Sequence, residues 1–269
     1  MNLFGDDMVI GDFRLSEYGL ILASFEDASD VEEELGMNYE TTEEYLASNP
    51  VPVFIDAKYS DKLRPIATII KDPCSLQEKH FTEHDCRCIL RELTGFYGYR
   101  TMQIYSNSMD EVLYFNVRIN NIKYKKIAGK IVGIILEMEC DSHFAWSKEF
   151  NYTFNISANT ILSFYNISDD LNNYLKPTIK IKASSDIAEL KIINQNDNNW
   201  ETIIKNISSN EIITMDCKNE ILESSTNRNV LNDFNMHFIR FVSGVNNLQV
   251  NSDVTIDISF KYPRKVGFV

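Results

Sequence analysis

The feature that most restricts the fold of this chain is a series of short segments in its second half. The segments combine apolar and β-branched residues, polar turns separate them, and their spacing is roughly ten residues. They are 150–156, 161–167, 177–183, 187–194, 200–206, 211–216, 237–242 and 254–262. Strands at this spacing, with no helical pattern of comparable strength, predict an all-β sandwich. Between the last two segments, SGVNNLQV carries Gly and Asn and is interpreted as a turn.

The first half mixes strand patterns with one helical pattern. Expected strands are 18–25, 51–56, 65–71, 100–106, 112–119 and 131–140. The helix is expected near 82–94, where Thr82 is a suitable N-cap, Asp85 follows three residues later, and Ile89, Leu90 and Leu93 share an apolar face. Composition also changes, because 20 of the 27 Asn lie in 146–269. We therefore predict an α+β chain, with a mostly-β domain at 1–145 and a β-sandwich at 146–269.

Charge excludes some functions. The 39 acidic and 26 basic residues give a net charge of -13, and clustered Lys and Arg are what a nucleic-acid binder needs. Nine acids and no base lie between Glu26 and Tyr45. Without a strong apolar face, residues 26–45 are interpreted as a solvated loop or a hairpin arm. No apolar run is long enough for a membrane span, and the acidic start is unlike a secretion signal, so we expect no membrane anchor.

The cysteines raise the question of a metal site. Cys74, His80, His84, Cys86 and Cys88 place five potential ligands within fifteen residues. Zinc sites are usually built from C-x2-4-C pairs on a tight loop, whereas this stretch is helical and would turn Cys86 away from His84 and Cys88. We expect free thiols in a reducing compartment and no metal.

Motifs for catalysis are not evident. The sequence has no nucleophile elbow, Walker loop, dinucleotide fingerprint or zinc-protease motif. We therefore expect no enzyme, no catalytic residues and no cofactor. Trp200, Tyr165 and Tyr174 are candidates for a sugar-stacking surface, but core packing is the favoured interpretation because aromatic rings dominate buried area.

Five segments follow an order and spacing found in a known family. They are SEYGLILASF, RELTGFYGYRTMQI, LYFNVRI, GKIVGIILEMECDSHFAW and, at the end, YPRK at 262–265. Across 13–146 they resemble the distal tail protein of long-tailed siphophages, most specifically at LTG (93–95) and ECDSHFAW (139–146). FIRFVSGVNNLQV is similar in general form to the galectin-like sandwich of that family. His143 stands where the family commonly has Pro, and the acidic run is longer than usual.

The resemblance implies a structural virion protein at the tail tip, synthesised and assembled in the host cytoplasm. Such a baseplate hub is a homo-hexameric ring, with stacked rings a further expectation, and an arm between its early strands clamps the neighbouring subunit. The expected partners are the tail-tube protein and a tail-associated lysin, tail fibre or receptor-binding protein. DNA only passes through the channel. Cell-wall carbohydrate is a further candidate partner in host attachment.

Two questions stay open from the sequence. The acidic run belongs either to the inter-subunit arm or a loop facing the channel, where it would repel DNA phosphates, or to the outer wall, where it keeps the free subunit soluble. The alternative function is a carbohydrate-binding, lectin-like module acting in adhesion to the host cell wall.

Overall fold

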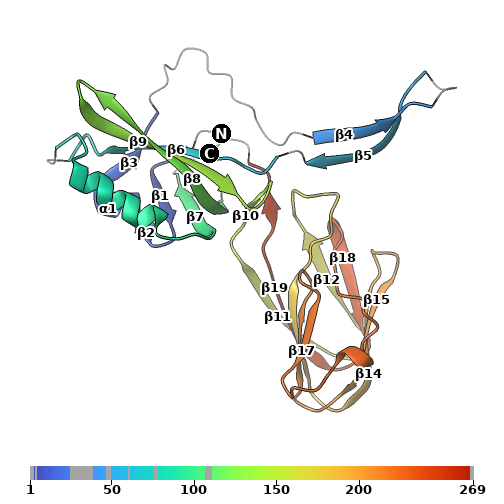
Figure 1. Cartoon of the computed structure of the whole chain (residues 1–269). Helices are drawn as coiled ribbons and strands as arrows, with labels where there is room; N and C mark the ends of the chain where they lie inside the picture. The colour runs from blue at the N-terminus through green and yellow to red at the C-terminus, as the bar shows by residue number, and fades with distance from the viewer. Residues whose placement is uncertain are drawn as a thin grey trace. The chain divides into compact units, whose positions relative to one another are not determined.

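The structure is a computed structural model, and it describes residues 3, 5–24, 39–46, 50–59, 61–75, 78–106 and 111–266. It divides into two compact units (Figure 1). Unit 1 comprises Met1–Ser147 and the chain end from Arg264, and unit 2 comprises Lys148–Pro263. The chain therefore leaves unit 1 once and returns to it for its last residues.

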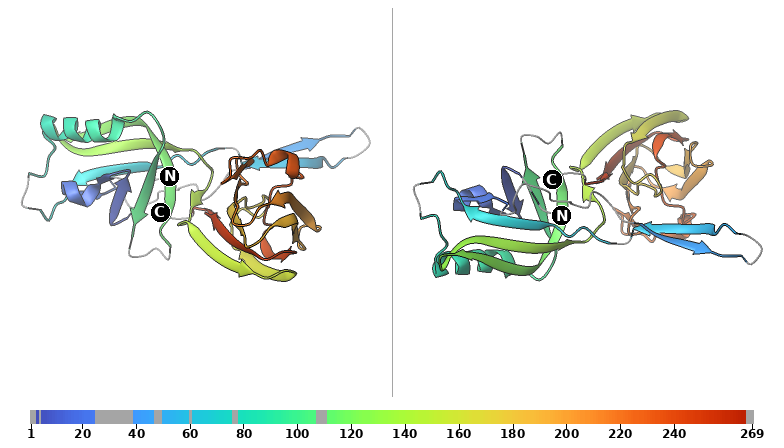
Figure 2. Two further views of the ribbon diagram at one scale, coloured as in Figure 1. Left: turned by 90° about the horizontal axis from the view of Figure 1, so that it is seen from below. Right: turned by 90° about the horizontal axis from the view of Figure 1, so that it is seen from above.

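Unit 1 is built on a nine-stranded antiparallel sheet. Its main path runs β2-β1-β7-β8-β9-β6-β3, while β10 pairs with β8 and with β20. The strands are β1 (Asp7–Ile10), β2 (Phe13–Arg14), β3 (Leu20–Leu22), β6 (Ile66–Lys71), β7 (Arg100–Tyr105), β8 (Tyr114–Ile127), β9 (Lys130–Cys140), β10 (Ala145–Trp146) and β20 (Pro263–Arg264). A short 3₁₀ helix, η1 (Leu15–Tyr18), links β2 to β3. Figure 2 shows the helix α1 lying along one side of this sheet.

Alternation along these strands produces the core of unit 1. Met8, Met102 and Ile104 are fully buried, and Phe115 and Leu136 join them from β8 and β9. Buried residues recur at every second position of these strands, so their side chains share one face of the sheet, and that face is apolar. Helix α1 covers part of that apolar core.

Helix α1 (Glu83–Thr94) confirms the helix expected near 82–94. The Thr82 hydroxyl accepts a hydrogen bond from the Asp85 amide at 3.2 Å, and the Asp85 carboxylate accepts one from the Thr82 amide at 2.9 Å. Ile89 and Leu93 are buried. Leu90 is 41% exposed, so its expected place on the apolar face was wrong. Its position is one residue past Ile89, about 100° around the helix.

Asp85 links the helix start to the sheet. Its burial alone would raise the pKa, but the hydrogen bonds from the Lys71 ammonium and from Thr82 outweigh this and lower the pKa of Asp85 to about 2. The Lys71 Nζ lies 2.8 Å from the Asp85 Oδ2. Because the pKa of Asp85 is lower in the folded protein than in the unfolded chain, the ionised carboxylate stabilises the fold. This stabilisation is present above the unfolded-state pKa near 3.8 and is lost as the pH falls toward 2.

Replacing Asp85 with Asn should lower the free energy of unfolding of unit 1 by about 1 kcal/mol near neutral pH. Near pH 3 the difference in unfolding free energy between variant and wild type should fall to about half. At that pH the Asp85 carboxyl is largely protonated in the unfolded chain, so its ionisation in the folded protein stabilises the fold less. Urea unfolding at several pH values measures this. Glu83→Gln is the matched control, since the Glu83 side chain is 92% exposed. A pH-independent loss for Asp85→Asn would contradict the assignment.

Unit 2 is a two-sheet sandwich, as the sequence predicts. One sheet has the order β11-β19-β13-β16-β17 and the other the order β12-β18-β14-β15. The strands are β11 (Phe150–Ile156), β12 (Thr160–Asn166), β13 (Thr178–Ala183), β14 (Ile187–Asn194), β15 (Trp200–Ile207), β16 (Ile212–Asp216), β17 (Ile221–Ser224), β18 (Gly244–Val250) and β19 (Val254–Phe260). The 3₁₀ helix η2 (Leu231–Asp233) follows β17. Inward side chains from both sheets, such as Ile179, Ile213, Leu248 and Val250, are buried between them, and Phe241 packs into the same core.

One predicted strand was wrong, and the neighbouring predicted turn is a strand. Residues 237–242 form no strand, because distant side chains bind their carbonyls: Trp200 Nε1 donates to Phe238 at 2.9 Å and Asn194 Nδ2 to Arg240 at 3.1 Å. SGVNNLQV instead supplies β18. The Asn246 side chain is fully buried there, accepting from the Val242 amide and donating to its carbonyl. Its hydrogen bonds satisfy a residue type that is otherwise typical of turns.

Candidate assembly site

A two-stranded hairpin of unit 1 is the first candidate surface. Strands β4 (Tyr39–Glu44) and β5 (Val53–Tyr59) pair only with each other among the described strands. Figure 1 draws them as a separate ribbon. Every side chain is exposed except Tyr59, which is half-buried. A lone hairpin is marginally stable in water, so one with both faces exposed is suited to a partner. We call this hairpin the arm.

The arm combines apolar and acidic side chains. Residues directly opposite each other share a face, so Tyr39, Thr41, Ala57 and Tyr59 share one face, and Glu40, Thr42, Asp56 and Lys58 share the other. The register shifts between Thr42 and Glu43, which interrupts this alternation, and beyond the shift Glu43 lies opposite Phe54 and Glu44 opposite Val53. Ile55 and Phe54 are 55% and 59% exposed. The arm therefore exposes apolar side chains together with carboxylates.

The root of the arm is tied to the end of β9. The Tyr59 ring stands edge-on to Phe144, with centroids 5.2 Å apart, and lies 5.5 Å from the His143 ring. Nδ1 of His143 hydrogen-bonds the Asp61 carbonyl. His143 is the residue that departs from the resembled family's Pro. In this protein its side chain hydrogen-bonds the backbone at Asp61, just after the end of β5.

The acidic run is only partly placed by the structure. Glu40, Glu43 and Glu44 lie on β4 and are exposed. The other six acids of the run, Glu26, Asp27, Asp30, Glu32, Glu33 and Glu34, lie outside the described residues. Part of the 26–45 segment is thus a hairpin strand, which fits one of the two interpretations made from sequence. The strand itself, Tyr39–Glu44, is not among the strands expected from sequence, because acids obscure its Thr41-Thr42 β-branched pair.

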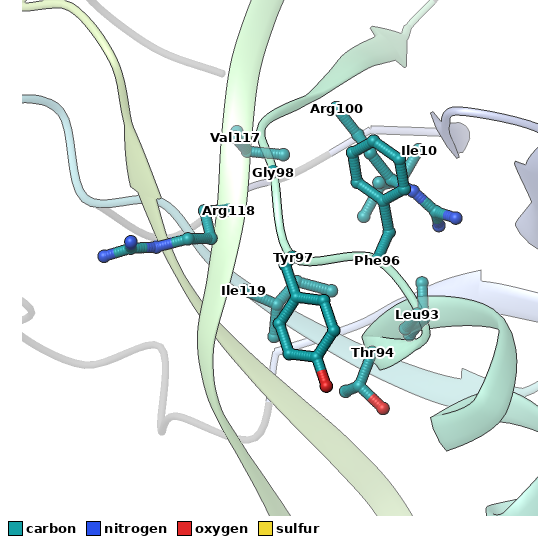
Figure 3. A pocket seen from close by; sticks show the side chains of 10 residues that line it. All are labelled: Ile10, Leu93, Thr94, Phe96, Tyr97, Gly98, Arg100, Val117, Arg118 and Ile119. Carbon is teal, nitrogen blue, oxygen red and sulfur yellow. The ribbon is translucent and has the colours of Figure 1, made fainter.

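A second candidate surface surrounds the loop after α1. A cavity of about 260 Å³ lies there, lined by Ile10, Leu93, Thr94, Phe96, Tyr97, Gly98, Arg100, Val117, Arg118 and Ile119 (Figure 3). Tyr97, one of the lining residues labelled in Figure 3, is 99% exposed. The Arg100 guanidinium lies 5.1 Å from the Phe96 ring centroid. Arg100 and Arg118 are the charged residues that line this cavity, and no carboxylate, imidazole or thiol lines it.

The potential metal ligands do not gather into a site. On α1 the Cys88 Sγ lies 3.6 Å from the His84 Nε2, as the helical spacing predicts. Cys86 faces the core instead, and burial raises the pKa of its thiol. His80 lies 3.4 Å from the Glu78 carboxylate, and Cys74 is exposed. In the part of the chain that the structure describes, no three His, Cys, Asp or Glu side chains are close enough to hold a metal ion.

Two of the three aromatic candidates in unit 2, Trp200 and Tyr174, pack in a stack with Arg240. The Arg240 guanidinium lies 3.7 Å from the Trp200 ring centroid and 3.9 Å from that of Tyr174. The His237 ring stacks on Trp200 with centroids 4.3 Å apart. Two groups this close to one ring centroid must occupy its opposite faces, so Trp200 has no free face for a sugar. Tyr165, 62% exposed, lies on β12 opposite Val245 and outside this stack.

Arg240 also holds a buried carboxylate. Its Nε lies 2.6 Å from the Asp197 Oδ2 and its Nη2 lies 3.3 Å from Oδ1, while the Asp197 side chain is 3% exposed. A bidentate pair of this kind fixes the orientation of the guanidinium between the two rings. The stack is therefore a structural support for the loop at 237–242.

Comparisons with known proteins agree with this picture of an assembly protein. Residues 4–142 match the family described as phage tail protein N-terminal domain, and residues 144–262 match phage tail C-terminal domain. The SPP1 Dit (gp 19.1) protein, described as a paradigm of the hub adsorption apparatus in phages infecting Gram-positive bacteria, superposes with a TM-score of 0.68. The identity is 11%, over 95% of this chain and 98% of that one.

A chain of the phage p2 baseplate in its activated conformation with Ca is also similar, with a TM-score of 0.48 and 9% identity over 96% of this chain and 94% of that one. No curated protein matches the sequence. None of the described helices is long and apolar enough to cross a membrane.

The fold, a mostly-β sheet unit followed by a β-sandwich, is that of a tail-hub protein. The two matched regions together span nearly the whole chain. The chain belongs to the phage tail protein family.

Proposed function

We propose that this protein is the distal tail hub of a long-tailed phage, a structural component without catalytic activity. Copies assemble through unit 1 into a hexameric ring. One face of the ring joins the tail-tube protein, and the other joins a tail-associated lysin, tail fibre or receptor-binding protein. The proposal places the protein at the virion tail tip after assembly in the bacterial cytoplasm.

One observation carries this proposal. The arm exposes apolar side chains, among them Val53, Ile55 and Tyr39, and its two strands pair with no other described strand. Leaving such side chains in water is unfavourable by roughly 25 cal/mol per Å², so they are suited to burial against another chain. The likeness of the fold to a hub protein supports the neighbouring subunit as that chain.

The acidic part of the arm fits the same proposal. Glu40, Glu43 and Glu44 are exposed on β4. In a ring they would remain on the free side or meet a basic surface, and six copies near a channel would repel passing DNA phosphates.

The carbohydrate-binding alternative is less well supported. Its candidate ring, Trp200, is enclosed between Arg240 and His237. Negative-stain images of the purified chain test the two functions. The hub proposal expects closed rings with a central hole. Single chains at micromolar concentration that bind cell-wall glycans would overturn it.

A further inference from the structure

The chain returns to unit 1 through residues 264–266, which we call the strap. Arg264 belongs to β20, which pairs with β10 of the sheet of unit 1. Val266 is 4% exposed and is a member of the buried cluster that fills unit 1. Unit 1 therefore takes part of its core from residues that lie beyond the whole of unit 2 in the sequence.

An ion pair also attaches the strap to unit 1. The Arg264 Nε lies 2.9 Å from the Glu111 Oε2, and the two side chains are 13% and 36% exposed. Glu111 lies just before β8 begins at Tyr114. A partly buried pair of this kind is screened less by solvent than a fully exposed pair. The strap is thus held by a strand pairing, an apolar side chain and an ion pair.

Unit 2 holds the residues just before the strap. Tyr262 is 3% exposed in the core of unit 2, and its hydroxyl donates to the Tyr165 carbonyl at 3.3 Å. The Pro263 carbonyl accepts a hydrogen bond from the Asp169 amide at 3.1 Å. Val266 follows Tyr262 by four positions. One short stretch of chain is therefore anchored in both cores.

The fold of unit 2 brings the strap to its place. Phe150 at the start of β11 lies opposite Phe260 at the end of β19. Strand β10 ends a few residues before Phe150, and β20 begins a few residues after Phe260. When β11 and β19 pair, the chain between β10 and the strap acts as a short link. In an unfolded unit 2 the same link is a long flexible loop, which lowers the effective concentration of the strap at its site.

We propose that the strap closes unit 1 last and that a folded unit 2 delivers it. Three residues with one buried apolar side chain bind weakly when nothing holds them in place, so the strap docks only while unit 2 is folded. Unit 1 thereby completes its fold only after unit 2 has been synthesised and folded. Chains without the strap, or with an unfolded unit 2, are kept out of the ring. This last consequence rests on the proposed function, whereas the docking of the strap does not.

Amide hydrogen exchange of the full chain, read by mass spectrometry, tests the docking. Val266→Ser removes the buried side chain and should speed exchange in β10 and at the start of β8 at least about tenfold. Arg264→Gln removes the ion pair and should speed it about threefold. Exchange in β13 and β18 of unit 2 should stay within about twofold of the wild type. The matched controls, Val245→Ser and Lys261→Gln, lie at exposed positions of unit 2 and should exchange as the wild type does.

A variant of unit 2 tests the delivery. Arg240 holds the buried Asp197 carboxylate, so Arg240→Leu weakens unit 2 without touching the strap. At a urea concentration that unfolds unit 2 of this variant but not of the wild type, exchange in β10 should rise to the level of Val266→Ser. Adding Val266→Ser should then change it by less than about twofold, because the strap is already released. A protected β10 beside an unfolded unit 2 would overturn the delivery, and wild-type exchange in Val266→Ser would overturn the strap.

Ring assembly supplies the functional measurement. Val266→Ser should need at least about tenfold more protein than the wild type to form half its rings, whereas Val245→Ser should assemble as the wild type does. Rings from Val266→Ser at the wild-type concentration would overturn the exclusion of incomplete chains. A wild type that forms no ring would instead overturn the proposed function, and the exchange measurements would still decide whether the strap closes unit 1.

Discussion

Replacing Val53 and Ile55, two exposed apolar residues of the arm, with Ser is expected to abolish ring assembly and leave the folded subunit intact. The two side chains are 42% and 55% exposed in the single chain, so their loss should change the free energy of unfolding by less than about 0.5 kcal/mol. In the ring, each pair buried against a neighbour contributes about 2–4 kcal/mol per contact. A closed ring repeats that contact between every pair of neighbours.

The chain offers a matched control for this double substitution. Val245 and Ile161 lie on the outer face of the sandwich and are 46% and 50% exposed. Val245→Ser with Ile161→Ser removes the same side chains from unit 2 and should leave ring assembly unchanged. Analytical ultracentrifugation measures assembly, and urea unfolding measures stability. Intact rings from the arm variant at wild-type concentration would show that these two side chains of the arm are not buried in the assembly.

Replacing Arg240 with Leu should destabilise unit 2 by about 3–5 kcal/mol. The change leaves the Asp197 carboxylate, 3% exposed, without its cation, and it removes the group packed between Trp200 and Tyr174. Arg240→Lys should recover only part of the loss, because an ammonium cannot make the bidentate contact or the planar stack. Urea unfolding followed by Trp fluorescence measures both variants.

The double variant Asp197→Asn with Arg240→Leu separates charge from packing. It should be more stable than Arg240→Leu alone, because no unpaired charge remains buried. Lys205→Met is the control, because it removes an ion pair at the surface. The Lys205 Nζ lies 3.7 Å from the Glu189 carboxylate, and both side chains are about half exposed. It should cost less than about 1 kcal/mol. A loss below about 1 kcal/mol for Arg240→Leu would mean that the pair does not support unit 2.

Local patterns predict the elements whose hydrogen bonds are local. The capping residues Thr82 and Asp85 correctly placed the helix start. The expected strands 150–156 and 187–194 coincide with β11 and β14, because apolar residues occupy every second position of 150–156 and every second residue of 187–194 is buried from Leu190 onward. The α+β class and the all-β second half are therefore visible in the sequence itself.

Long-range side-chain hydrogen bonds explain what the patterns miss. The 237–242 segment has the composition of a strand. Its carbonyls instead accept hydrogen bonds from the side chains of Trp200 and Asn194, which lie more than thirty residues away in the sequence. Gly244 and Asn246 are typical of a turn, but they lie in the first half of β18. Asn246 is accommodated there because its buried side-chain amide hydrogen-bonds with Asn194 and Val242. For the arm, the sequence predicted a strand at 51–56, which corresponds to β5, and a loop or hairpin arm within 26–45. The pairing of β4 with β5 depends on their register, including the irregularity after Thr42, which composition does not encode.

The mass of the assembled protein tests the central claim most directly. Native mass spectrometry of the purified chain at about 10 µM, a concentration at which a specific ring contact is populated, should give a dominant species of six times the 31.1 kDa chain mass. The Val53→Ser, Ile55→Ser variant should give the single-chain mass under the same conditions. A wild type that remains a single chain would contradict the account.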